Sequence, residues 1–320
     1  MPYYTKKMID VSCIIINYNT SKYTFEAVAS ILKTHVNTIS FEIIVVDNAS
    51  HNEDYLQLKT SIEALKADNV CLVRSNINTG FGTGNMTGVQ HASPCKYFAF
   101  INNDTLQVST NALGQLMQFM DNNKSVGICS PQMLDENKNF RVTIDHFSSI
   151  QREILKRKVL ETIWPKTYLN RKIEYKKPTK VHYVQGSFMF VDAIVFNELG
   201  GFDTNLFLYY EESDLSLRFL RKKQKSTYLI PSVNYIHYNG ISTTRNIDIK
   251  IEQKISLLYY IKKHFGWFHH QILLKWFIIR YFFTSIIKPK YWKVFYVLLI
   301  GAPLSKSLKQ KQSIKTLDAN

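Results

Sequence analysis

The sequence predicts an α/β protein with a doubly wound, mostly parallel sheet, followed by a helical region rich in aromatic and basic residues. Short apolar runs alternate with segments of helical periodicity through about the first hundred residues, the pattern of a sheet with helices packed on it. The runs are continuous rather than alternating, as expected for strands covered on both faces. With 320 residues, 45% hydrophobic and 20% charged, the chain can bury a large core and is not of the disordered class.

Each expected element follows from its local pattern. The first helix rests on Phe25, Val28 and Ile31, which recur at helical spacing. In chain order we expect strands over residues 11–17, 41–46, 70–74 and 96–101, helices over residues 21–34 and 52–67, and a glycine-rich turn over residues 80–85 that leads into a helix to about residue 91.

The chain divides into a first domain, residues 1–250, and a C-terminal region, residues 251–320. The residues that follow Val181 carry further apolar runs and belong to the first domain. Residues 141–180 read as a basic helical insertion, because residues 151–180 hold ten Lys and Arg against three Glu.

Polar side chains stand where the expected strands end. Asn17, Asp47, Arg74 and Asp104 hold such positions, and the carboxyl ends of parallel strands form one ligand-binding crevice. A second acidic group, Glu211-Glu212-Ser213-Asp214, opens an expected helix about a hundred residues later. Buried carboxylates are unfavourable unless they hold a cation, a proton or a substrate. A metal-holding site with a separate base is the arrangement that chemistry with a phosphate leaving group needs.

The net charge of +15 is concentrated in two segments. Residues 254–315 hold twelve Lys and Arg with no Asp or Glu, interleaved with aromatic pairs such as Trp267-Phe268 and Trp276-Phe277. This composition favours peripheral attachment to an anionic membrane surface. The alternatives are binding to nucleic acid, whose phosphates alone would not require the apolar residues, and a helical part of the core with a solvated basic face. No uncharged run reaches the roughly 18 residues of a spanning helix.

Two further features bear on location. The N-terminal segment, residues 1–10, has no long apolar run, so we expect no secretory signal and a cytoplasmic protein, peripheral on the inner face of the membrane. The cysteines are scattered without a Cys-x-x-Cys pair, which predicts neither disulfides nor a zinc site. They are Cys13, Cys71, Cys95 and Cys129.

Six motifs occur in order along the chain. They are Asn17-Tyr18-Asn19, residues 45–50, the glycine-rich residues 78–85, Asn102-Asn103-Asp104, Gly201-Phe202-Asp203 and the acidic residues 207–218. Over about residues 10–245 the chain therefore resembles glycosyltransferase family 2, in particular its bacterial rhamnosyltransferase-like and galactofuranosyltransferase-like members. The resemblance implies a GT-A fold, a nucleoside-diphosphate-sugar donor, a divalent metal and inversion at the anomeric carbon.

The resemblance implies metal ligation by Asp104, with Asn102 as a helper and His237 completing the site. Mg²⁺ or Mn²⁺ suits such a site, because hard cations take one or two carboxylates and let donor phosphates fill the remaining positions. Relatives often carry Asp-x-Asp here, and Asn102 replaces the first acid. The alternative is an Asn/Asp turn after a strand, with a structural histidine.

Donor binding is implied for a larger set of residues along the crevice. Asp47 could instead cap the following helix, and Arg74 could be a surface arginine. The set is Asn17, Tyr18, Asn19, Asp47, Asn48, Arg74, Gly80, Phe81, Gly84, Asn85, Asn102, Asn103 and Gly186.

Glu212 is the predicted general base, aligned with the acid that activates the acceptor hydroxyl in the family. Relatives mostly use Asp, and Glu211 is left open as sharing the role. Asp214 is expected to order the start of the helix and to pair with Arg218 four residues on.

The expected substrates rest on the resemblance. We expect L-rhamnose from dTDP-rhamnose first and UDP-galactofuranose or a UDP-hexose next, with a polyprenyl-diphosphate-linked or saccharide acceptor of cell-surface polysaccharide synthesis such as O-antigen or capsule. No nucleic acid partner is expected, and a homodimer is left open. Two other classes stay in view: a nicotinamide-dependent oxidoreductase, since Gly80-x-Gly82 imitates the dinucleotide fingerprint, and a non-catalytic basic membrane binder.

Overall fold

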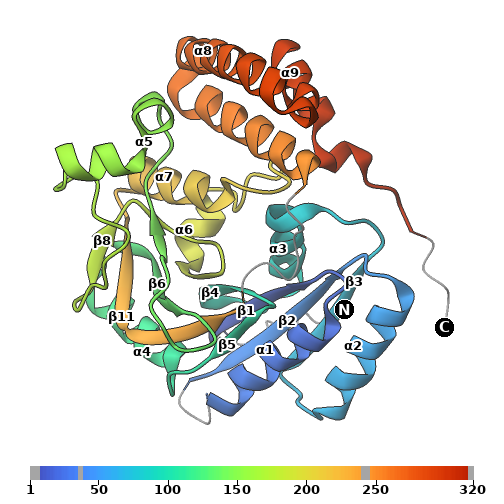
Figure 1. Cartoon of the computed structure of the whole chain (residues 1–320). Helices are drawn as coiled ribbons and strands as arrows, with labels where there is room; N and C mark the ends of the chain where they lie inside the picture. Colours follow the sequence, from blue (N-terminus) through green and yellow to red (C-terminus); the bar gives the residue numbers. More distant parts are fainter. Residues whose placement is uncertain (1–7, 35–38, 239–245, 316–320) are drawn as a thin grey trace.

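The computed structural model describes residues 8–34, 39–238 and 246–315 (Figure 1). The first seven residues of the N-terminal segment, on which the expectation about a secretory signal falls, lie outside this set. The elements are β1 (Ile9–Asn17), α1 (Ser21–Thr34), β2 (Phe41–Asn48), α2 (Asn52–Ala64), β3 (Val70–Ser75), α3 (Gly80–His91), β4 (Cys95–Asn102), β5 (Thr105–Gln107), α4 (Ala112–Asn122), β6 (Val126–Leu134), β7 (Ile144–Asp145), α5 (Ile150–Ile163), β8 (Thr179–Val181), β9 (Tyr183–Val184), β10 (Phe188–Asp192), α6 (Ala193–Glu198), α7 (Glu211–Lys223), β11 (Ser226–His237), α8 (Ile247–Ile287) and α9 (Trp292–Leu299), followed by short 3₁₀ turns.

A central sheet organises the described part of the chain. Its strand order is β3-β2-β1-β4-β10-β6-β11-β5, with β8 paired to β11. The pairs β3–β2, β2–β1, β1–β4 and β6–β11 are parallel, while β10 runs antiparallel to both of its neighbours. The expected α/β class with a mostly parallel sheet is confirmed.

Helices cover both faces of this sheet, which explains why its strands are apolar throughout. One core joins α1, α2 and α4 to one face, through residues such as Val28, Leu58 and Leu116. The other joins α3, α6 and α7 to the opposite face, through Phe196 and Phe219 among others. The two layers lie on opposite sides of the strands in Figure 1. This is the doubly wound arrangement that the continuous apolar runs predict.

The glycine-rich segment differs from its prediction. We expected a turn over residues 80–85, but α3 begins at Gly80 and the glycines form its first turns. A side chain at Gly80 would collide with the carbonyl oxygen of Phe207, and one at Gly88 with the side chain of Ile14. A Cβ atom at Gly84 would make a tight but less severe contact, 3.0 Å from Cδ1 of Ile16. The glycines therefore let α3 pack closely against β1 and the loop before α7. A glycine-rich sequence is equally consistent with close approach of a ligand, so the sequence alone does not distinguish the two reasons.

The segment that we expected to be a helical insertion, residues 141–180, contains one helix and also strands. It holds β7, α5 and β8, and β7 pairs with β9 in a small separate sheet. Helix α5 is kinked at Lys156, whose backbone angles (φ 73°, ψ 157°) are not helical.

The C-terminal region is a helical unit docked on α7. Helix α8 bends back at Gly266 (φ 87°, ψ 176°). Lys254 Nζ consequently lies 3.9 Å from the centre of the Phe277 ring, although a straight helix would separate the two residues by roughly 35 Å. Both halves of α8 share a core with α9 and with Leu217 of α7. The boundary expected at residue 250 falls inside α8.

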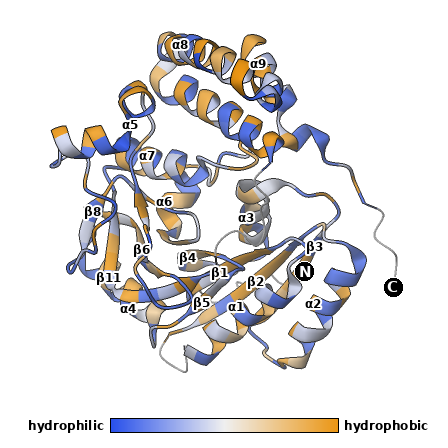
Figure 2. Cartoon of the chain, in the orientation of Figure 1, coloured by the Kyte–Doolittle hydropathy of each residue, from blue (hydrophilic) through white to orange (hydrophobic). Residues whose placement is uncertain are grey.

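This unit exposes many large apolar side chains among its basic residues. Figure 2 shows hydrophobic residues recurring along α8 and α9, with hydrophilic ones between them, and many of the large apolar side chains are exposed. Within the residues that the structure describes, no helix combines the length and the apolar character needed to cross a bilayer.

Candidate active site

The polar residues at the strand ends converge, as the sequence predicts. The parallel register sets Asn17 beside Asp47 and Asp47 beside Arg74. The Asn17 side-chain amide donates to Asp47 Oδ1 (2.9 Å), and its Oδ1 accepts from Thr24 (2.7 Å). Asn103 donates to the same threonine oxygen (2.9 Å). One hydrogen-bond network therefore ties the ends of β1, β2 and β4 into a fixed crevice.

A cavity of about 370 Å³ opens beside this network, and we call it the donor-side cavity. Seven of the predicted donor residues line it, while Leu308 and Gln312 come from the C-terminal segment, which sequence analysis did not place here. The lining residues are Ile16, Tyr18, Asn48, Asn78, Gly80, Phe81, Asn85, Ile101, Asn102, Asn103, Phe207, Leu208, Asn246, Ile249, Leu308 and Gln312.

The other predicted donor residues lie behind this wall or beside it. Asn17 and Asp47 are completely buried and bond to each other. Burial raises the pKa of Asp47, against the opposing effects of Ser50, Asn17 and Arg74. Arg74 lies over the ring of Tyr55, with Nε 3.7 Å from Asp47 Oδ2. Asn17 and Asp47 thus stabilise the crevice edge through bonds within the protein.

Two more members of the predicted set hold turns in place. Asn19 accepts from the backbone N–H of His51 (2.8 Å), while Asn48 accepts from the backbone N–H of Thr79 (3.0 Å) and donates to the Gly80 carbonyl (3.2 Å). Asn48 therefore fixes the start of α3 against the end of β2, and it also faces the donor-side cavity.

Asp104 and His237 lie together although 133 residues separate them in the chain. Strand β5 pairs antiparallel with the end of β11, which sets His237 opposite Thr105. His237 Nε2 lies 3.0 Å from Asp104 Oδ1, and both residues are buried. Across residues 8–34, 39–238 and 246–315, no group of three or more His, Cys, Asp or Glu side chains is arranged to hold a metal ion. The pair offers one oxygen and one nitrogen donor.

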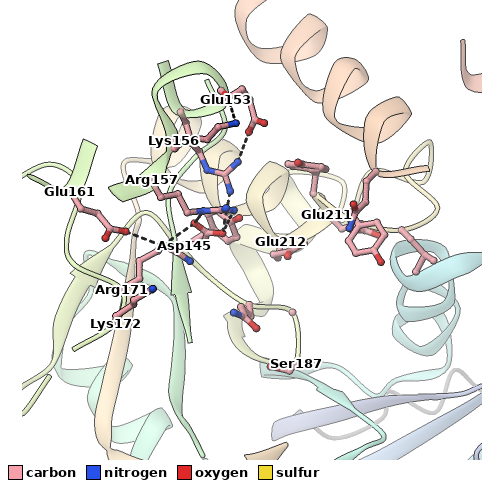
Figure 3. Close-up of a pocket in the computed structure, with 18 of the residues that line it drawn as sticks. Asp145, Glu153, Lys156, Arg157, Glu161, Arg171, Lys172, Ser187, Glu211 and Glu212 are labelled. Atoms are coloured by element: carbon pink, nitrogen blue, oxygen red, sulfur yellow. Dashed lines mark hydrogen bonds and ion pairs between the residues drawn. The ribbon is translucent and has the colours of Figure 1, made fainter. Parts of the chain in front are cut away.

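A larger cavity of about 1080 Å³ adjoins the first, and we call it the acceptor-side cavity (Figure 3). The two share Phe81, Asn102 and Leu208, so they lie next to each other. Gly186 and Ser187 line its floor, and His237 faces it as well. Glu211 and Glu212 stand on its wall at the start of α7.

The backbone before α7 is strained in a way that presents these two acids. Tyr209 and Tyr210 both have left-handed angles (φ 73° and 72°), a conformation that costs non-glycine residues about 1–3 kcal/mol each. Burial raises the pKa of Glu212 to about 7, with a contribution from Asp145. Burial and the neighbouring Glu212 raise the pKa of Glu211 well above its ordinary value. Glu212 is therefore the acid of the pair that ionises near neutral pH.

Asp214 anchors α7 rather than facing the cavity. Arg218 Nε donates to Asp214 Oδ2 (2.8 Å), which confirms the pair expected at four-residue spacing. His264 and Lys263 of α8 lie 2.7 and 2.5 Å from Asp214 Oδ1. Although burial alone would raise it, the hydrogen bond with His264 and the positive charges of Arg218 and Lys263 lower the pKa of Asp214 to about 2.

Comparison with known proteins identifies this arrangement of crevice and acids. A model described as glycosyl transferase family 2 matches residues 12–200. The chain belongs to glycosyl transferase family 2. This membership sets aside the oxidoreductase and the non-catalytic binder as alternatives.

One curated relative of this glycosyltransferase is N-acetylglucosaminyl-diphospho-decaprenol L-rhamnosyltransferase of Mycobacterium tuberculosis, found in two strains. The two chains are 24% identical over 215 residues, which cover 62% of this chain and 69% of the relative. The match supports the rhamnosyltransferase-like branch of the family.

Solved structures confirm the GT-A fold of this glycosyltransferase. GalNAc-T7 with UDP, GalNAc and Mn²⁺ superposes with a TM-score of 0.60 at 15% identity, over 80% of this chain and 48% of that one. The chain therefore spans about half the length of that structure. The mannosyltransferase PcManGT from Pyrobaculum calidifontis with GDP-Man and Mn²⁺ gives a TM-score of 0.57 at 14% identity, over 94% and 87% of the two chains. At these identities the likeness concerns the fold.

The glycosyltransferase also has a charged wall that motif analysis missed. Arg157 binds Asp145 through Nε (2.7 Å) and Nη2 (2.6 Å), and Arg152 Nη2 adds a third contact (3.1 Å). Although burial alone would raise it, Arg152 and Arg157 lower the pKa of Asp145 to about 2. Figure 3 shows this cluster beside Glu212. Its only signal in the sequence is the density of basic residues in the insertion.

Proposed function

We propose that this glycosyltransferase is an inverting enzyme that moves a hexose from a nucleoside diphosphate to an acceptor hydroxyl. The observation that carries the proposal is that the two cavities share Asn102, while the acceptor-side cavity is also lined by Glu212 and by His237, which contacts Asp104. The donor-side cavity would hold the nucleotide sugar and the larger cavity the acceptor. A sugar hydroxyl is a poor nucleophile, so it needs a base at this junction.

Glu212 has the role of the base in this reaction. The acceptor hydroxyl gives its proton to the Glu212 carboxylate while its oxygen bonds to the anomeric carbon, and the nucleoside diphosphate departs from the opposite face. A carboxylate with a pKa near 7 is both ionised and basic enough at neutral pH. Glu211 is buried and keeps its proton, so it would not act as the base itself and would assist Glu212 as its neighbour.

Asp104 and His237 would hold the divalent metal. The residues fit a metal because of their ligand atoms: Mn²⁺ and Mg²⁺ bind carboxylate oxygen, and Mn²⁺ also binds imidazole nitrogen. Two protein ligands would leave room for the phosphates of the nucleotide sugar. A bound cation supplies the positive charge that stabilises a departing diphosphate. The structural neighbours GalNAc-T7 and PcManGT were solved with Mn²⁺ and a nucleotide or nucleotide sugar, which supports the same use here.

L-Rhamnose from dTDP-rhamnose is our first choice of donor, and a polyprenyl-diphosphate-linked saccharide our choice of acceptor. The name of the mycobacterial relative supports both. UDP-galactofuranose and UDP-hexoses are the next donors in order. The pathway we propose is cell-surface polysaccharide synthesis.

We further propose that residues 251–315 rest on an anionic membrane surface on the cytoplasmic side. About half of the exposed large hydrophobic side chains in the described residues lie between Trp267 and Ile300. Phe283, Ile286 and Ile287 are 60%, 58% and 78% exposed, and lysines and arginines alternate with them. Interfacial helices bind membranes through this combination of apolar area and positive charge.

A donor panel tests the proposed activity. The full chain is incubated with dTDP-rhamnose, UDP-galactofuranose, UDP-hexoses or GDP-sugars, with and without Mn²⁺ and a lipid-linked acceptor, and free nucleotide is measured. We expect metal-dependent release from one donor that Glu212→Gln suppresses. Release that is absent with every donor, or equal in both proteins, contradicts the proposal.

A further inference from the structure

Cations from two helices gather where α5 packs against α8. Lys156 comes from the kink of α5, and Lys254 and Arg280 come from the two halves of α8. Burial and the nearby Arg280 lower the pKa of Lys156. Burial lowers the pKa of Lys254 to about 8, and the positive charges of Lys250, Arg280 and Lys156 add to the shift.

No carboxylate in the described part of the chain forms an ion pair with this cluster. Lys156 Nζ donates to the backbone carbonyl of Glu153 (3.3 Å), and Lys254 Nζ lies 3.9 Å from the centre of the Phe277 ring. The carboxylate of Glu153, the acid of α5 whose charge opposes the shift in the pKa of Lys254, binds Arg152 instead at 2.6 Å. Three like charges held together without acids destabilise a fold, so their arrangement points to an anionic ligand.

The backbone of Lys156 gives an independent sign that its side chain is needed. Its angles (φ 73°, ψ 157°) belong to a region that is populated almost only by glycine. The same chain uses a glycine for a nearly identical kink in α8, where Gly266 has φ 87° and ψ 176°. A lysine in this conformation is strained, and glycine would relieve the strain. The position keeps a cation at the expense of stability.

The cluster lies between the acceptor-side cavity and the apolar face of α8. Lys156 lines the cavity, where Figure 3 shows it beside Glu153 above Arg157 and Glu212. Arg280 is exposed on α8, one helical turn from Trp276 on one side and Phe283 on the other. A ligand that contacts both regions has an anionic group joined to an apolar chain, with a sugar reaching toward Glu212.

We propose that Lys156, Lys254 and Arg280 bind the diphosphate of a polyprenyl-diphosphate-linked acceptor, with its first lipid units on the apolar face of α8. This site rests on the proposed function in one respect, that the acceptor is lipid-linked. It is distinct from the Asp104–His237 pair, near which the donor diphosphate would lie.

The test uses the full chain and farnesyl diphosphate, a short soluble polyprenyl diphosphate, with binding measured by titration calorimetry. Farnesol, which lacks the diphosphate, and inorganic diphosphate, which lacks the lipid, are titrated as comparison ligands to measure how much each part contributes to the affinity. We expect the wild type to bind farnesyl diphosphate at least about tenfold more tightly than either, since hydrogen bonds to charged groups and buried apolar area both contribute.

Lys156→Gly is the decisive variant, because it removes the charge and relieves the strain. We expect its melting temperature to rise and its affinity for farnesyl diphosphate to fall by about tenfold or more, so misfolding cannot explain the loss. Arg280→Gln should weaken binding similarly, and Lys156→Arg should retain most of it. Lys275→Gln, an exposed lysine on the same helix, is the matched control and should bind as the wild type does.

Two results overturn the proposal. Wild-type affinity in both Lys156→Gly and Arg280→Gln excludes these residues as the site, and inorganic diphosphate binding as tightly as farnesyl diphosphate excludes a lipid-linked ligand. Because the measurement is binding, its outcome is separate from that of the donor panel. An enzyme that releases no nucleotide but binds farnesyl diphosphate through these cations would contradict the proposed activity and leave the site standing.

Discussion

Replacing Glu212 with glutamine should abolish most activity and at the same time stabilise the fold above neutral pH. Burial raises the pKa of Glu212 from 4.5 to about 7. In the unfolded chain this carboxyl ionises near its ordinary value, so ionisation favours the unfolded state as the pH rises from about 4.5 to 7. The shift corresponds to at most about 3 kcal/mol at pH 8, at about 1.4 kcal/mol for each pKa unit, and to about 1 kcal/mol at pH 5.

Glutamine has nearly the same shape and never ionises, so the variant avoids this loss. We expect Glu212→Gln to melt at a higher temperature than the wild type at pH 8, with a smaller difference at pH 5. Glu174→Gln, at an exposed position beside Lys176, is the matched control and should melt as the wild type does at both pH values. Thermal unfolding of the three proteins in the two buffers measures the effect.

The activity of the wild type should follow the same ionisation. If the Glu212 carboxylate takes the proton, kcat/KM should rise about tenfold per pH unit below 7 and level off above it. The variant should lose roughly 10²-fold or more in kcat while keeping its affinity for the donor nucleotide. Nucleotide release from pH 5.5 to 9 measures both.

Three results would refute this reasoning. If kcat/KM does not change with pH, no group with a pKa near 7 acts as the base. If Glu212→Gln is less stable than the wild type at pH 8, the argument that burial of an ionised Glu212 destabilises the fold is wrong. An inactive Glu211→Gln beside an active Glu212→Gln would show that the base lies one residue earlier.

Three shorter predictions concern the metal pair, the anchor of α7 and the apolar face. Asp104→Ala should reduce turnover by orders of magnitude and EDTA should silence the wild type; full nucleotide release in EDTA contradicts the metal role. Arg218→Met should lower the free energy of unfolding by roughly 3 kcal/mol, because it leaves buried Asp214 short of a partner, and unchanged denaturation would contradict this. Phe283→Ser with Ile287→Ser should weaken sedimentation with anionic vesicles and leave nucleotide binding intact; equal sedimentation would contradict the membrane proposal.

The sequence predicts the first half of the fold because buried parallel strands and amphipathic helices leave different patterns. Asn17 and Asp47 end continuous apolar runs, so their meeting at one edge of the sheet follows from topology alone. Nothing in the sequence of β10 indicates whether the strand runs parallel or antiparallel to its neighbours. Only the pairing in the structure shows that it is antiparallel to both β4 and β6. The pairing of Asp104 with His237 was predicted from the resemblance to family 2. Composition and local periodicity could not predict it, because 133 residues separate the two in the chain.

The parts that the sequence does not predict depend on contacts between distant segments. The sequence pattern around Gly80 and Gly88 is the same whether a ligand or another segment of the protein approaches them, and in the structure the neighbours are Phe207 and Ile14. Gln312 reaches the donor-side cavity from the far end of the chain. Its segment is held there by pairwise bonds, such as that of Ser307 to buried Glu252 (2.9 Å), which leave no periodic pattern.

Helix α7 connects the proposed membrane surface to the proposed base. Glu212 stands in its first turn, and two residues later Asp214 binds His264 of α8. Leu217, on the next turn, is buried in the core of the C-terminal helices. A shift of α8 relative to the sheet would therefore move the base relative to Asp104. If α8 rests on the bilayer, the surface that carries the lipid of the acceptor also fixes the height of the carboxylate that receives the acceptor proton, and the C-terminal helices then act as a structural part of the catalytic domain.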